Sequence, residues 1–188
     1  ADALYFTMLN HNKRSITLNL KTPEGREIFF KLVRNADVVV ENYRPDVKDR
    51  LGINYDALRR INPRIILASI SGFGQDGPYR ERPGFDQIAQ GMSGLMSVTG
   101  QPGQGPMRTG TAIADISAGL YAALGIMTAL LEREQSGEGQ WVQSSLLQNG
   151  LWANGCFVQN RLFGEHVPHR PPRTAAPSAL ANHYRCRD

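Results

Sequence analysis

The order of short apolar runs and amphipathic segments in the first 70 residues is the feature that most restricts the fold. Residues 15–20 alternate like a β-strand, and residues 37–42 and 65–70 are short apolar runs typical of buried parallel strands. Residues 23–34, which open with a proline, and residues 55–61 have helical patterns. This alternation of strands and helices predicts an α/β fold, namely a Rossmann-like layered domain with a mainly parallel sheet and right-handed crossovers.

The rest of the chain continues this alternation. A glycine-rich loop at residues 72–79 follows the third expected strand, at the strand end where open α/β sheets bind ligands. Residues 141–145 predict another strand and residues 146–163 another helix. Residues 164–188 are rich in proline, so we expect a linker there and a domain over residues 1–163.

Asp115 is the only charged residue between Thr109 and Leu131. An ionised carboxylate that loses water without gaining partners is strongly destabilising, so Asp115 needs a partner or a task. It could cap a helix that begins near Ile116, be a buried acid satisfied by backbone NH groups, or carry chemistry. The run from Ala112 onward is long enough to cross a bilayer, but its polar and glycine residues favour a helix buried in the protein.

Charge and rare residue types exclude several classes of function. The net charge of +4 comes from scattered basic residues without interleaved aromatic rings, which disfavours nucleic acid and fits a ligand with a few phosphates. The 2 cysteines lie far apart and the 4 histidines lack partners at ligand spacing, so we expect no metal site, and Cys156 is expected in the core. No dinucleotide, Walker or serine-hydrolase motif occurs in its required context. The chain does not open with a secretory signal, which predicts a cytoplasmic location.

Several phrases nevertheless follow one another in a recognisable order. They are residues 12–21, 40–52, 71–79, 82–86, the AlaAsp pair at 114–115, and the run 132–140. Together they resemble the class III CoA-transferase family, also called CaiB–BaiF, which includes formyl-CoA transferase and α-methylacyl-CoA racemase. By this resemblance the chain is a partial one that begins after the family's first strand–helix unit and ends as its small domain would begin.

The resemblance implies a covalent mechanism at Asp115. In the transferases, the matching aspartate attacks an acyl-CoA thioester to give a mixed anhydride, and the CoA thiolate then forms an aspartyl-CoA thioester that passes CoA to an acceptor acid. The implied partners are an acyl-CoA, a carboxylic acid and a second copy in an interlocked homodimer, with no tightly bound cofactor. A place in the first turn of a helix would help keep Asp115 ionised.

The resemblance also implies a site for CoA. The backbone of residues 18–21 would line the adenine and pantetheine, residues 42–44 would follow them, and Arg50 would meet phosphate. The implied CoA-binding residues are Leu18, Asn19, Leu20, Lys21, Asn42, Tyr43, Arg44, Arg50, Arg82, Pro83, Gly84 and Phe85. Without the motif, Arg44 and Arg50 would be interpreted as solvated surface residues.

Phe85 distinguishes the activities within the family. Racemases carry a histidine at this position as one of two bases, and phenylalanine cannot move a proton. Phe85 could equally be a core residue, and neighbouring Asp86 is a candidate for orienting the pocket or bonding to the backbone. Three hypotheses therefore stand: a CoA-transferase, an acyl-CoA racemase with another base near Asp115, and an inactive CoA-binding fragment.

Overall fold

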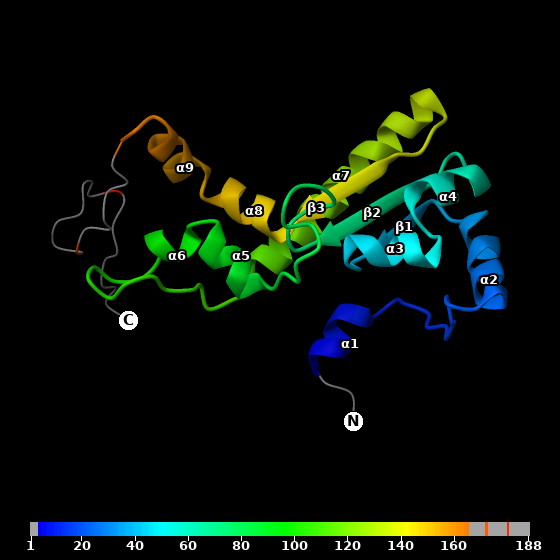
Figure 1. Cartoon of the computed structure of the whole chain (residues 1–188), viewed down its shortest axis with the longest axis horizontal. Coiled ribbons are helices and arrows are strands. Elements are labelled where there is room, and N and C mark those ends of the chain that lie inside the picture. Colours follow the sequence, from blue (N-terminus) through cyan, green and yellow to red (C-terminus); the bar gives the residue numbers. More distant parts are fainter. Residues whose placement is uncertain (1–3, 166–171, 173–179, 181–188) are drawn as a thin grey trace.

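The centre of the fold is a parallel three-stranded sheet in the order β1 (Val38–Glu41), β2 (Ile66–Ser71) and β3 (Trp141–Ser145), as Figure 1 shows. The structure is a computed structural model that describes residues 4–165, 172 and 180. Val39 pairs with Leu67, which in turn pairs with Trp141. The predicted α/β class and parallel sheet are confirmed.

Nine helices surround this sheet in the described residues. They are α1 (Leu4–Asn10), α2 (Pro23–Val33), α3 (Pro45–Leu51), α4 (Tyr55–Ile61), α5 (Asp86–Met92), α6 (Leu95–Val98), α7 (Ile113–Ser136), α8 (Leu146–Ala153) and α9 (Gly155–Leu162). In Figure 1, α2, α3 and α4 lie on one side of the strands and α7 on the other, while α5, α6, α8 and α9 gather beyond the ends of β2 and β3.

Two apolar clusters hold these layers together. One joins α2 and α4 to the sheet through buried Val33, Leu58 and Leu67. The other joins α5, α7 and α8 to the end of β2 through small residues, of which Ala89 and Ala118 are buried. The second cluster matters most for the site, because it fixes where α7 begins.

The long helix α7 is buried on one face only. Its buried positions are mostly alanines, spaced four or seven residues apart along one face, which lets the helix lie close to β2 and β3. Its opposite face is apolar and exposed, at Ile116, Leu120, Leu124, Met127 and Leu131. The expectation of a helix buried all round is therefore wrong. In the described residues, α7 is also the one helix whose length and apolarity would suffice to cross a membrane.

Three local expectations are wrong. Residues 15–20 form no strand, because no neighbouring strand pairs with them; instead Asn19 accepts from the backbone NH of Thr22 and leads the chain into α2. The helix expected at 146–163 is broken at Asn154, whose backbone NH still bonds to the carbonyl of Gly150 while its side-chain amide donates to the carbonyl of Ser93 at 3.1 Å. Cys156 is exposed rather than buried. The expected linker, residues 164–188, lies mostly outside the described residues.

Candidate active site

Asp115 is the third residue of α7 and therefore lies in its first turn. It is not the helix cap, because α7 begins at Ile113 and Ala112 occupies the capping position without a side-chain bond. Asp115 is exposed as a residue, and within the described part of the chain its carboxylate accepts no hydrogen bond. Both structural explanations for this acid, a cap and a buried satisfied carboxylate, are therefore excluded.

The environment of Asp115 disfavours its ionised form. Partial desolvation of the carboxyl group, and then the negative charge of Asp86, raise the pKa of Asp115 above its ordinary value. The first turn of a helix was expected to act in the opposite direction, by stabilising an anion. The result is a carboxylate that is a stronger base and nucleophile than a solvated one.

Asp86 contacts the backbone of the first turn of α7, next to Asp115. It is 9% exposed, and its Oδ1 atom accepts hydrogen bonds from the backbone NH groups of Ala114 at 2.8 Å and Asp115 at 3.3 Å. The expectation that Asp86 bonds to backbone therefore agrees with the structure. Asp86, which belongs to α5, therefore takes the place of the capping side chain that α7 lacks.

Asp115 lines a cavity of about 330 Å³ at the end of the sheet, and we call this cavity the inner cavity. Its walls come from the ends of β1 and β2 and from the starts of α7 and α8. The lining residues are Asn42, Ile70, Ser71, Gly72, Gly84, Asp115, Gly119 and Leu146. Asp115 is the only ionisable side chain among them.

A middle cavity of about 150 Å³ adjoins the inner one, since both are lined by Asn42, Ser71, Gly72 and Gly84. Its remaining walls are richer in cations. They are formed by Tyr43, Arg44, Pro45, Arg80, Arg82 and Pro83. The structure thus brings together residues 42–44 and 82–84, which are distant in sequence, beside Asp115.

An outer cavity of about 500 Å³ lies on the other side of Tyr43, which lines both it and the middle cavity. It is lined by Leu18, Asn19, Leu20, Lys21, Arg26, Tyr43, Val47, Arg50 and Leu51. All the CoA-binding residues implied by the resemblance, with one exception, therefore line three adjoining cavities that lead to Asp115. The exception is Phe85, which is 68% exposed and lines none of the three.

The alternative expectation, that Phe85 is a core residue, is also wrong, because its side chain is exposed. It precedes α5 in an extended conformation, and this places the following Asp86, rather than Phe85, against α7. Among the described residues no histidine adds a base here, because His11 is exposed and bonds to the carbonyl of Met8. His166, His169 and His183 lie outside the described residues. The described part of the chain contains no group of side chains that could hold a metal.

A close contact between two glycines shapes the passage from the middle to the inner cavity. A Cβ atom added at Gly72 would lie 2.5 Å from the Cα of Gly84, and one added at Gly84 would meet the Cα of Gly72 at the same distance. The backbone carbonyl of Gly72 also accepts from the NH of Leu147 at 3.0 Å, which ties the loop to α8. Only glycine permits this approach.

The arginines of the passage keep donors for a ligand. Asp46 holds Arg44 at 3.5 Å and Arg50 at 3.1 Å, but more than half of each arginine side chain is exposed. The guanidinium of Arg82 lies 4.1 Å from the centre of the Tyr79 ring, which orients it by a cation–π contact. Arg80 is a lining residue that the sequence reasoning missed; its position after a glycine-rich loop was the available signal.

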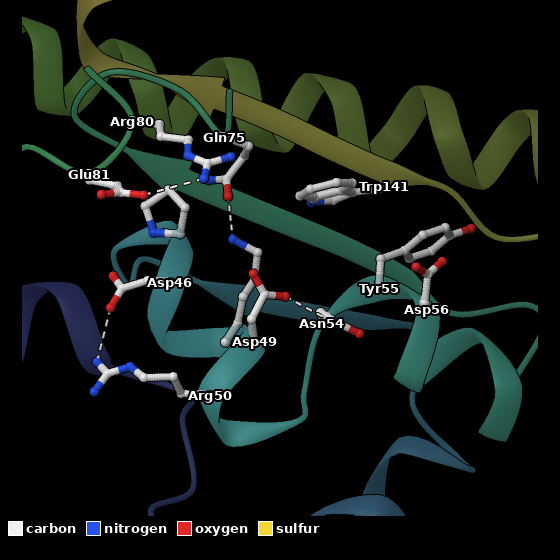
Figure 2. Close-up of a pocket in the computed structure, with 12 residues that line it drawn as sticks. Asp46, Asp49, Arg50, Asn54, Tyr55, Asp56, Gln75, Arg80, Glu81 and Trp141 are labelled. Atoms are coloured by element: carbon white, nitrogen blue, oxygen red, sulfur yellow. Dashed lines mark hydrogen bonds and ion pairs between the residues drawn. The ribbon is translucent and has the colours of Figure 1, made fainter. Parts of the chain in front are cut away.

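A side cavity of about 400 Å³ lies beside this passage, between α3, α4 and the loop after β2 (Figure 2). Arg50 lines both the side and outer cavities and points towards Asp46 in Figure 2. Buried Lys48 donates to Gln75 there and lies 3.7 Å from the carboxylate of Glu41. These contacts fix the loops after β1 and β2 relative to each other, and with them the middle cavity.

The arrangement has defined chemical abilities. The inner cavity presents one partly desolvated carboxylate, and the middle cavity beside it is bordered by arginines. A ligand with a phosphate group and a long thin arm would fit these spaces, because cations attract phosphate and the glycines Gly72 and Gly84 add no side chains to the walls shared by the middle and inner cavities.

The chain is similar to enzymes that transfer CoA. It is 48% identical over 170 residues to the succinate–glutarate CoA-transferase of Agrobacterium fabrum, covering 90% of this chain and 42% of that enzyme. It is 51% identical over 160 residues to the formyl-CoA:oxalate CoA-transferase of Streptomyces avermitilis, covering 85% of this chain and 38% of that enzyme. The chain thus spans less than half the length of these relatives.

Solved structures and the family's sequence pattern agree with these relatives. The crystal structure of a CaiB/BaiF family protein from Brucella suis superimposes with a TM-score of 0.84 and 42% identity, over 89% of this chain and 44% of that one. The sequence model of CoA-transferase family III matches residues 1–188. The chain therefore belongs to CoA-transferase family III.

Proposed function

We propose that the protein moves CoA from an acyl-CoA donor to a free carboxylic acid, with Asp115 as the covalent nucleophile. One observation carries this proposal: the carboxylate of Asp115, which accepts no hydrogen bond from the described residues, lines the inner cavity beside a middle cavity bordered by arginines. The CoA-transferase names of the similar enzymes support the reaction class. CoA would extend from the outer cavity, past the arginines of the middle cavity, to bring its thioester beside Asp115.

The reaction would proceed through four acyl transfers. The Asp115 carboxylate attacks the thioester carbonyl, so that the C–S bond breaks and a mixed anhydride and CoA thiolate form. The thiolate attacks the aspartyl carbonyl, which releases the donor acid and leaves an aspartyl-CoA thioester. The acceptor carboxylate displaces the thiolate from this thioester, and the thiolate then takes the acceptor acyl group and regenerates Asp115. Each step exchanges one activated acyl group for another.

The inner cavity favours transfer over racemisation. A two-base exchange at the α-carbon needs a second proton acceptor, and the lining residues provide none beside Asp115. Phe85 cannot act as a base, and both oxygens of buried Asp86 already accept hydrogen bonds. Deuterium incorporation at the α-carbon of a 2-methylacyl-CoA, in the absence of CoA exchange, would instead establish a racemase.

Mass spectrometry of the natural full-length protein tests the proposal. After mixing with an acyl-CoA, the peptide containing Asp115 should gain the mass of CoA less one water, and Asp115→Ala should abolish both this adduct and CoA exchange. Asp76→Ala is the matched control, because Asp76 is exposed and lines neither the inner nor the middle cavity. CoA exchange at the wild-type rate by Asp115→Ala would exclude Asp115 as the nucleophile. Calorimetric binding of CoA without turnover by the wild type would identify a CoA-binding module instead.

A further inference from the structure

The first turn of α7 has no capping side chain of its own. The 24-residue helix begins after Ala112, which makes no side-chain bond, so the first NH groups need partners from elsewhere. Asp86, the first residue of α5, provides one oxygen for two of them, the NH groups of Ala114 and Asp115. This contact joins residues 28 and 29 positions apart in the sequence.

Gln90 holds Asp86 in this place. Gln90 is fully buried, one turn after Asp86, and its Nε2 atom donates to the other oxygen of Asp86 at 2.6 Å. The same amide accepts from the backbone NH of Thr109 at 2.9 Å and donates to the carbonyl of Thr111 at 3.3 Å. The segment that enters α7 and the carboxylate that caps α7 are therefore fixed by one side chain.

This arrangement has a direct consequence for the neighbouring nucleophile. Free NH groups at the start of a helix attract anions, and they would ordinarily stabilise a carboxylate in the first turn. Here the NH groups of Ala114 and Asp115 are directed at Asp86 instead, and the Asp115 carboxylate accepts no hydrogen bond within the described residues. A carboxylate without donors keeps more of its electron density available for attack.

We infer that Asp86, restrained by Gln90, is a positioning residue for the Asp115 nucleophile: it fixes the start of α7 and withholds the helix NH groups from the Asp115 carboxylate. The inference rests on the proposed function, since it concerns how that nucleophile is kept reactive. The two acids thus have different tasks, although they are close in space. Asp86 is buried and its carboxylate is hydrogen-bonded, whereas the Asp115 carboxylate accepts no bond from the described residues and lines the inner cavity.

The charges around Asp115 make this inference measurable. Among the elements that pack extensively against α7, the strands β2 and β3 and the helix α8 have no ionisable side chain, and α5 has Asp86 alone. The cations of the middle cavity, Arg44, Arg80 and Arg82, oppose the effect of Asp86. Removing the charge of Asp86 while retaining an acceptor should therefore lower the pKa of Asp115.

Three substitutions in the natural full-length protein separate position from charge. Asp86→Ala removes the contact, and we expect kcat to fall by about 100-fold, as for a nucleophile displaced by about 1 Å, while KM for the acyl-CoA changes less than about twofold. Asp86→Asn keeps one acceptor for the NH groups, and the acidic limb of its pH–rate profile should move to lower pH. Asp86→Glu keeps the charge and should retain the acidic limb of the wild type.

A second readout does not depend on catalysis. The carboxyl carbon of Asp115 can be followed by ¹³C NMR in protein labelled at aspartate, with Asp115→Asn identifying its signal. In Asp86→Asn this carbon should titrate at lower pH than in the wild type, and circular dichroism should show an intact fold. An unchanged titration together with an unchanged pH–rate profile in folded Asp86→Asn would overturn the inference. If Asp115→Ala instead retained transfer, the proposed function would fail, and the NMR titration would still decide whether Asp86 acts on Asp115.

Discussion

Replacing Gly72 by alanine tests the shape of the passage that leads to Asp115. Gly72 does not have a positive φ, so alanine suits its backbone and any effect must come from the added methyl group. That methyl group would lie 2.5 Å from the Cα, 2.9 Å from the N and 3.3 Å from the carbonyl carbon of Gly84. Because ordinary contacts between such atoms begin near 3.4 Å, the two backbone segments must separate by roughly 1 Å.

The separation has a cost in stability and a larger cost in activity. Overpacking of this kind typically destabilises a domain by about 1–3 kcal/mol. For a domain of this size, each kcal/mol lowers the melting temperature by about 2–4 °C. Since the same backbone lines both the inner and the middle cavity, a shift of roughly 1 Å should also reduce kcat/KM for acyl-CoA by up to about 100-fold.

Thermal unfolding by calorimetry and initial rates of CoA exchange measure the two effects. Gly155→Ala is the matched control, since a Cβ atom at Gly155 meets nothing within 4 Å and the residue begins a helix away from the passage. The control should melt at or slightly above the wild-type temperature with unchanged activity. Wild-type melting and wild-type activity in Gly72→Ala would refute both the close contact with Gly84 and its role in shaping the two cavities.

The structure supports three more predictions. Asp115→Asn should abolish transfer yet stabilise the fold at neutral pH, because folding raises the pKa of Asp115 and its ionisation at higher pH therefore weakens the wild-type fold. In urea unfolding, the gain in stability of Asp115→Asn over the wild type should be larger at pH 8 than at pH 4, and an equal gain at both pH values would contradict this reasoning. Arg133→Ala should lower the free energy of unfolding by about 1.5–3 kcal/mol, since buried Arg133 bonds to Asp37 at 2.8 Å and to a carbonyl, whereas Glu134→Ala, which removes an exposed pair, should cost less than about 1 kcal/mol. Arg82→Ala should weaken CoA binding by about tenfold in calorimetry, corresponding to about 1.4 kcal/mol, and an unchanged affinity would remove Arg82 from the site.

The sequence predicted the central layers well because their patterns are local. β1, β2 and β3 and helices α2 and α4 lie within about one residue of the expected segments, where apolar runs and caps dictate the structure. Residues 15–20 have a strand pattern but no partner strand, which shows that alternation alone does not make a sheet. The break at Asn154 also depends on a distant contact, with Ser93, that no local pattern contains.

The residues that line the candidate site could be predicted from the sequence, but the hydrogen bonds that position them could not. The family motifs name Asp115 and residues 42–44, which the structure brings to the walls of the inner and middle cavities, and Asp86 was a candidate for orienting the pocket. Nothing in the sequence, however, shows that Asp86 takes the NH groups of α7, because that bond joins two helices whose approach depends on the whole second cluster. Similarly, the GlyPheAsp phrase directed attention to Phe85, while the contacts belong to the residues on either side of it.

Arg133 and Asp86 fix the two ends of α7 to the sheet and to α5. With 24 residues, the helix is about 36 Å long, and Arg133 anchors its far end to Asp37 and to the carbonyl of Arg64 beside the beginnings of β1 and β2. Its near end is anchored by Asp86 beside the strand ends. Because both ends of α7 are fixed to the sheet, we expect a change at the Arg133 contacts to shift the helix and with it Asp115, although these contacts lie at the opposite ends of the strands from the inner cavity.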